Sequence, residues 1–351
     1  ELFWKSVARS GRIQLFCAII GLVLNKNIKL ILNYVIGPLV FCLLAFSIYR
    51  QLHRQPNWLE SLYQLKNVFT GPGLWQLIAA VGLMLVNWGL EARKWQLAVR
   101  NVQPIAFIKC LKAVFSGITL AFFTPNRIGE YLGRVLYIQE GKRIQAISVT
   151  IACSMAQLLV TWTAGMAGLL YIKSCTLRQG GQSGDVYWMN AVLYGVLGGT
   201  VILTLLYFRL AWLVRWIEKI PGIERLVRHI RVLERFNATI LLRILSLSGV
   251  RYGVFIAQYY LLFAAFGVQM DVEQVFGAVS VVFLVLSIVP TIAVITELGV
   301  RWKASIEIVQ LFNSNLAGIL AASLAIWIIN LVIPALAGSL LILGIRIFNK
   351  K

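Results

Sequence analysis

Residues 105–134 read IAFIKCLKAVFSGITLAFFTPNRIGEYLGR, an apolar run followed by a short polar motif and a glutamate–arginine pair. The apolar part, 105–123, predicts a helix. The polar run TPNR at 124–127 stops that helix, because proline cannot continue a helix and biases the preceding residue away from helical geometry. Glu130 and Arg134 follow at a spacing of four, so they share one helix face and can pair. Such a pair beside an apolar helix is either a simple helix-stabilising contact or part of a functional site.

A second stretch repeats this pattern 167 residues further along the chain. There an apolar segment over 275–289 ends at Pro290 and Thr291, and Glu297 precedes Arg301 by four residues. In both copies a threonine lies six residues before the glutamate. The shared spacing predicts an internal repeat built around two broken helices.

The composition is typical of a protein that lives in a bilayer. Of the 351 residues, 59% are hydrophobic and 13% are charged, whereas soluble domains have about 45–50% apolar and about 25% charged residues. The net charge of +20 raises nucleic-acid binding as an alternative. Basic loops beside apolar spans are, however, typical of the cytoplasmic faces of membrane proteins and attract anionic lipids. We therefore expect one transmembrane domain over 1–351, with membrane phospholipids as partners and no nucleic acid. A homo-oligomer is compatible with the sequence.

Six segments are long and apolar enough to cross a bilayer as helices, for which about 20 residues are needed. They cover 28–49, 73–90, 146–172, 191–208, 239–266 and 315–345. Residues 13–24 are apolar but too short for a confident span, so we assign 1–27 to an interfacial N-terminal segment.

The distribution of lysine and arginine discriminates between two topologies. If 105–123 and 275–289 are full spans, the basic residues fall almost equally on both sides of the membrane. If each is the first leg of a re-entrant hairpin, whose second leg starts at the Glu-x-x-x-Arg motif, 24 of the 33 basic residues lie on one side and 7 on the other. The positive-inside rule favours the second topology, with both termini in the cytoplasm.

This topology predicts an all-α polytopic membrane protein, a bundle of about six full spans plus two re-entrant helical hairpins in an inverted repeat. The first repeat covers 73–172, and the inverted second repeat covers 239–345. Inverted repeats with broken helices near the midplane are a transporter architecture. Non-helical backbone is tolerated at that depth only where it lines a cavity inside the protein. We expect a multi-pass protein of the cell inner (plasma) membrane.

The connection over 209–237 is strongly basic and interleaves its charges with tryptophan and isoleucine. This pattern is typical of an amphipathic helix on the cytoplasmic surface, and equally of a plain positive-inside loop. Both interpretations stay open.

Nothing in the sequence indicates a metal or a cofactor. The five cysteines lie mostly inside apolar runs without zinc-ligand spacing, and His53 and His229 are far apart. No nucleotide-binding loop is present, so we expect no cofactor and no direct use of ATP.

At the two polar motifs the sequence resembles a known family. Asn87-Trp88 with Arg93, Lys94 and Trp95 also fits the family's pattern. The chain is similar to the membrane domain of lysylphosphatidylglycerol synthases of the multiple peptide resistance factor type, and to their stand-alone flippase-like relatives. The resemblance implies translocation of aminoacylated or otherwise modified phospholipids between leaflets. It also implies a stand-alone form, without the soluble domain that carries the synthase activity in the larger relatives.

The leading hypothesis is a lipid flippase or transporter that binds a charged phospholipid in a midplane cavity. Arginines would hold the lipid phosphate through charge-assisted hydrogen bonds, and glutamates would bind a cationic headgroup or order the arginines. The candidate lipid-binding residues are Thr124, Pro125, Asn126, Arg127, Glu130, Arg134, Arg251, Glu297 and Arg301. Arg251 shares a predicted helix, and by its spacing of eight a face, with Arg243; the alternative for Arg251 is snorkelling or a simple ion pair.

Two other classes of function stay open. A membrane-embedded enzyme acting on lipid-linked substrates would use Glu130 and Glu297 as general acid and base. The sequence shows no Asp-x-Asp motif, no membrane-embedded histidine and no Ser/His/Asp set, so we assign no catalytic residues. A non-catalytic accessory protein would instead recruit a partner through 209–237.

Overall fold

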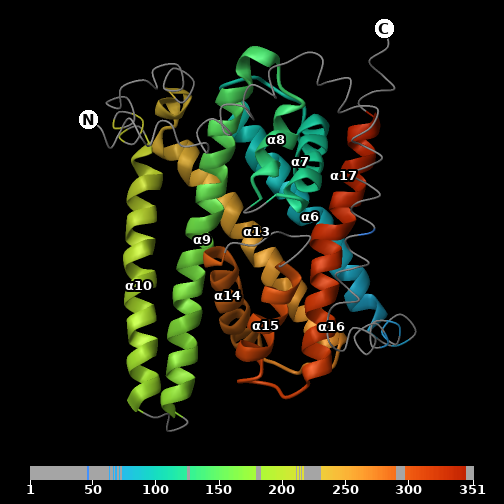
Figure 1. The fold of residues 1–351 in the computed structure, drawn as a ribbon, viewed down its shortest axis with the longest axis vertical. Helices are drawn as coiled ribbons and strands as arrows, with labels where there is room; N and C mark the ends of the chain where they lie inside the picture. Colours follow the sequence, from blue (N-terminus) through green and yellow to red (C-terminus); the bar gives the residue numbers. More distant parts are fainter. Residues whose placement is uncertain are drawn as a thin grey trace.

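The computed structural model describes residues 73–124, 127–178, 183–210, 231–289 and 297–344, with a few isolated positions before 73 and between 210 and 217. Within these ranges every regular element is a helix (Figure 1). The predicted all-α class is confirmed.

Five helical segments of the described part are long and apolar enough to cross a membrane. They match five of the six predicted spans; the sixth, 28–49, lies outside the described residues, as does the interfacial segment 1–27. The five are α6 (Leu74–Val99), α9 (Arg143–Arg178) with the 3₁₀ turn η2 (Glu140–Lys142) before it, α10 (Ser183–Phe208), α13 (Ala238–Ala265), and a last span made of α16 (Leu316–Trp327), the π-turn η5 (Ile328–Val332) and α17 (Ile333–Gly344).

Two pairs of shorter helices lie between these spans. The first pair is α7 (Phe107–Phe122) with α8 (Gly129–Val135), and the second is α14 (Val272–Ile288) with α15 (Leu298–Val309). At 1.5 Å per residue, α7 is about 24 Å long and α14 about 26 Å, less than a hydrocarbon core of about 30 Å. Figure 1 shows α7 and α8 in the upper half of the molecule and α14 and α15 in the lower half.

The turn from α7 into α8 is held by Thr124. Its Oγ1 accepts a hydrogen bond from the Gly129 amide at 2.7 Å and donates to the Leu120 carbonyl at 3.3 Å. Arg127 has a φ of 59°, in the left-handed region that residues other than glycine seldom adopt. The predicted helix break therefore occurs where the sequence places it, although Pro125 and Asn126 themselves lie outside the described residues.

The close contact between α7 and α8 depends on glycine. A Cβ atom added to Gly133 would lie 2.4 Å from both the Cα and the N atom of Gly117. These are backbone atoms, which cannot rotate away as a side chain can. We therefore expect Gly133→Ala to lower the free energy of unfolding by about 1–3 kcal/mol or more, as overpacking does.

The matched control for this substitution is Gly82→Ala on α6, where an added Cβ meets nothing within 4 Å. It is expected to leave stability unchanged or to raise it by up to about 1 kcal/mol, because alanine favours helix over glycine. Thermal unfolding of the detergent-solubilised protein, followed by tryptophan fluorescence, compares the two variants. Equal unfolding temperatures would contradict the close α7–α8 contact.

The last span contains a π-turn that the sequence analysis did not predict. Pro334 has no N–H to donate to the carbonyl of Asn330, four residues earlier. The wider turn over Ile328–Val332 accommodates this missing bond, and π-turns of this kind occur often at functional sites. The Asn330 side chain is buried at this turn.

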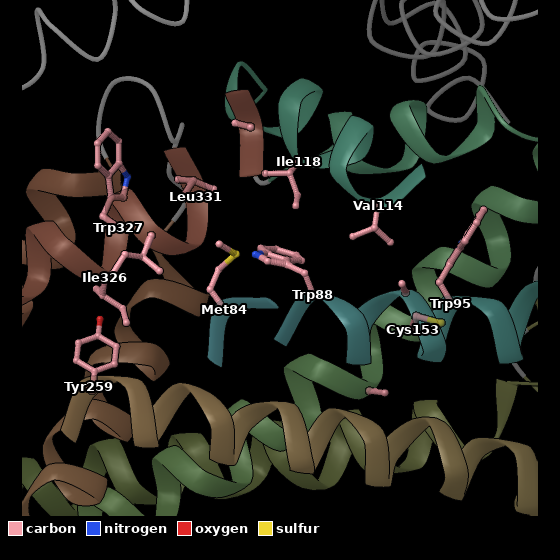
Figure 2. Close-up of a cluster of buried hydrophobic side chains, with 14 of the residues drawn as sticks. Met84, Trp88, Trp95, Val114, Ile118, Cys153, Tyr259, Ile326, Trp327 and Leu331 are labelled. Carbon is pink, nitrogen blue, oxygen red and sulfur yellow. The ribbon is translucent and has the colours of Figure 1, made fainter. Parts of the chain in front are cut away.

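The core joins the two halves of the chain. α13 packs along α6, α9 along α14, and α17 along α7. Figure 2 shows Trp88 of α6 within the apolar cluster, with Ile118 and Val114 of α7 on one flank and Trp327 and Leu331 of the last span on another. Residues far apart in sequence therefore enclose the centre of the bundle.

Only parts of the basic connection 209–237 are described. Leu210 and Val214 are buried, whereas Trp212 and Trp216 are exposed, and all four positions are helical. This sorting into two faces supports the amphipathic interpretation for its first turns. Residues 217–230 lie outside the described residues, and the connection ends in the 3₁₀ turn η3 (Arg231–Arg235).

Candidate functional site

A buried carboxylate on α6 gathers three cations. Glu91 is 3% exposed. Its carboxylate oxygens lie 2.7 Å from Lys94 Nζ, 2.8 Å from Arg134 Nη2 and 3.0 Å from Arg251 Nη1. Because the two arginines belong to α8 and α13, this ion cluster ties the first short-helix pair to two spans. Charges buried among apolar helices are costly unless they are paired in this way.

Both predicted glutamate–arginine pairs form. Arg134 donates to Glu130 within α8, and Arg301 Nη2 lies 2.8 Å from Glu297 Oε1 at the start of α15. Glu130 is also 3.8 Å from the Nε of Arg127, whose side chain is 42% exposed. Glu130 therefore links the exposed Arg127 to the buried cluster around Glu91.

Arg251 is fixed by neutral partners as well as by Glu91. Its Nε donates to Asn87 Oδ1 at 2.6 Å, and its Nη1 donates to Gln157 Oε1 at 3.3 Å. The guanidinium lies over the Trp88 ring, 4.9 Å from its centroid, a cation–π contact. Arg251 is 8% exposed, so it points into the bundle and does not snorkel.

Arg243 does not join this site. It lies on α13 as expected, but it is exposed whereas Arg251 is buried. Eight residues at about 100° each leave the two side chains about 80° apart around the helix. The inference that they share a face was therefore wrong.

A chain of amides continues from Arg251 through α6 and the last span and returns to α13. Asn87 Nδ2 donates to Asn330 Oδ1 at 3.3 Å, and Asn330 Nδ2 donates to Gln258 Oε1 at 3.1 Å. On the other side, Arg301 Nη1 donates to the hydroxyl of Tyr259 at 2.9 Å. Arg251 and Arg301 are thus oriented by hydrogen bonds to neutral side chains. These partners do not neutralise the positive charge of the guanidinium groups.

A cavity of about 230 Å³ opens between these groups. Residues of both motifs line it, together with residues of the central spans. The charged residues of its lining are Arg127, Arg251, Glu297 and Arg301; the polar ones are Gln157, Thr161, Ser287 and Asn330; the aromatic ones are Trp88, Tyr252, Phe255, Phe283 and Trp327. Four of the nine candidate residues from the sequence therefore meet at one cavity.

The charges in and around this cavity do not balance. The described residues of the cavity lining and the adjoining Glu91 cluster together hold five cations and three carboxylates, a surplus of two positive charges. The cations are Lys94, Arg127, Arg134, Arg251 and Arg301, and the carboxylates are Glu91, Glu130 and Glu297. In a medium of low dielectric, an anionic group in the cavity would offset this surplus.

The remaining candidates occupy other places. Glu130 and Arg134 are bound into the Glu91 cluster and are not part of the cavity lining. Thr124 is also absent from the lining and holds the turn between α7 and α8. Pro125 and Asn126 lie outside the described residues.

Several residues of the site were not predicted from the sequence. Glu91, Asn87, Gln157 and Asn330 were not among the candidates. A signal for two of them exists: Asn87, Glu91 and Lys94 are spaced four and three residues apart, so they form one polar face at the end of a predicted span. The predicted span ended at residue 90, whereas α6 continues to Val99, because these polar side chains are paired inside the bundle.

Within the described ranges, no three or more His, Cys, Asp or Glu side chains are grouped so that they could hold a metal ion. The family model described as the lysylphosphatidylglycerol synthase TM region matches residues 56–338. This match spans both short-helix pairs and every residue of the cavity. A comparison with curated proteins gives no significant match.

Proposed function

The chain belongs to the family of lysylphosphatidylglycerol synthase transmembrane regions, and from this premise we propose that it binds the phosphate of a charged phospholipid in its charged cavity and moves that lipid between leaflets. The family and the five apolar spans make it a multi-pass membrane protein with a lipid-related role. Its lipid is anionic or aminoacylated, and its membrane is the cell inner (plasma) membrane, with cytoplasmic termini.

The observation that carries this proposal is the surplus of positive charge around a cavity inside a bundle of apolar spans. Arg251 and Arg301 are held in place by Asn87, Gln157 and Tyr259. The buried Nε of Arg301 has no hydrogen-bond partner among the described residues, and the Nε of Arg127 has only a long ion pair with Glu130, at 3.8 Å. These donors are suited to phosphate oxygens, which accept charge-assisted hydrogen bonds from guanidinium groups.

The route across the membrane is part of the same proposal. We take α7–α8 and α14–α15 as two re-entrant hairpins of an inverted repeat. Two observations support this arrangement. α7 and α14 are too short for a full crossing, and the two helix pairs lie in opposite halves of the molecule (Figure 1). In such architectures, one repeat moves against the other around a central site and exposes it to each side in turn.

The enzyme alternative finds less support in the geometry. A general base needs a carboxylate free to accept a proton from the substrate. Glu130 is paired with Arg134 and Arg127, and Glu297 with Arg301. Both carboxylates are therefore better suited to ordering arginines.

A lipid-exchange assay tests the proposal. Purified protein in liposomes is expected to exchange headgroup-labelled anionic or aminoacylated phospholipid between leaflets faster than protein-free liposomes. Arg301→Ala is expected to slow this exchange by about tenfold or more, since a hydrogen bond to a charged group contributes about 1.5–3 kcal/mol. Lys303→Ala, an exposed lysine on the same helix, is the matched control and should exchange at the original rate. Exchange at background with the unmodified protein would contradict the proposed function.

A further inference from the structure

A second space, apolar and separate from the charged cavity, lies between α6 and the last span. It has a volume of about 270 Å³ and is lined only by aliphatic side chains. The lining residues are Leu74, Leu77, Ile78 and Val81 of α6, and Ala325, Ile328, Ile329 and Ile333 of the last span. Leu74, Ile78 and Ile333 are exposed, so this apolar groove opens at the surface of the helices that the structure describes.

A short segment of the last span separates the apolar groove from the charged cavity. On this segment the groove is lined by Ala325, Ile328 and Ile329. The cavity is lined by Ile326, Trp327, Asn330 and Leu331. The π-turn η5 therefore forms a common wall, with one face apolar and the other carrying the Asn330 amide. The two spaces together match the two parts of a phospholipid, a charged headgroup and an apolar tail.

We propose that the apolar groove binds an acyl chain of the phospholipid whose headgroup occupies the charged cavity. The headgroup part of this inference rests on the proposed function. Hydrocarbon is the occupant that suits a groove lined by aliphatic side chains, because an unfilled groove forfeits dispersion contacts along its walls. Transmembrane helices, in contrast, pack on one another through small residues such as glycine, alanine and serine. The bulky leucine and isoleucine rim here suits a flexible chain better than a second helix.

Photolabelling tests the groove directly. The protein is reconstituted with a phospholipid that carries a photoactivatable diazirine in its acyl chain, and labelled peptides are mapped by mass spectrometry. Labelling is expected to concentrate on 74–81 and 325–333. Ile78→Trp fills the groove from its rim and should reduce labelling of 325–333 to the level of other lipid-facing segments.

Leu85→Trp is the matched control, since Leu85 lies on the same helix, is 61% exposed against 63% for Ile78, and does not line the groove. It should leave the labelling pattern unchanged. Even labelling over all lipid-facing helices, or equal effects of the two substitutions, would overturn the acyl-chain site. A disulfide-linked dimer formed by Ile78→Cys but not by Leu85→Cys would also overturn it, because a second copy would then occupy the groove. Lipid exchange is measured on the same samples and tests the proposed function separately.

Discussion

Replacing Glu91 by glutamine is expected to lower the free energy of unfolding by about 3–5 kcal/mol, the usual cost of removing one partner from a buried ion pair. The reason is that Lys94, Arg134 and Arg251 all lose their shared carboxylate and stay buried. The apparent unfolding temperature in detergent measures the effect.

Glu140→Gln is the matched control for this substitution. Glu140 is 51% exposed at the side chain and lies 3.9 Å from Arg143, and exposed pairs contribute about 0–1 kcal/mol. A shift in unfolding temperature as small for Glu91→Gln as for Glu140→Gln would contradict the central role of the buried carboxylate.

Replacing Arg251 by alanine is expected to weaken phospholipid binding by about 10- to 100-fold, from the loss of charge-assisted hydrogen bonds. Arg251 lines the cavity and is oriented by Asn87 and Gln157. Arg251→Lys should recover only part of the affinity, because a single ammonium cannot contact those amides and a phosphate with the geometry of a guanidinium. Equilibrium binding of a labelled lipid to the detergent-solubilised protein measures both variants.

The matched control is Arg243→Ala, which removes the same charge from the exposed face of the same helix. Binding should stay unchanged in this variant. If Arg243→Ala and Arg251→Ala weaken binding equally, the contribution of Arg251 is a general electrostatic attraction of the protein for anionic lipid, and the specific site is contradicted.

The sequence predicted those features that depend on local patterns. A run of apolar residues is a local property, so the five described spans were found from hydropathy, and the helix break after Phe123 was found from Thr124 and Pro125. The spacing of four between glutamate and arginine predicted both ion pairs correctly. The inverted repeat inferred from these motifs stays a prediction.

The remaining part of the site depends on contacts between distant residues. Glu91 meets Arg134 from 43 positions away, Arg251 meets Asn87 from 164, and Asn87 meets Asn330 from 243. No local pattern encodes such a contact, because it follows from how α6, α13 and the last span pack together. The sequence identified Arg251 as a candidate but not the carboxylate and amides that hold it.

The proposed transport requires that a lipid headgroup enters the charged cavity inside the bundle. Electron cryomicroscopy of the protein in nanodiscs of anionic phospholipid tests it most directly. Phosphate density is expected within about 3 Å of a guanidinium nitrogen of Arg251 or Arg301. Headgroup density confined to the outer surface of the bundle, with none in the cavity, would contradict it.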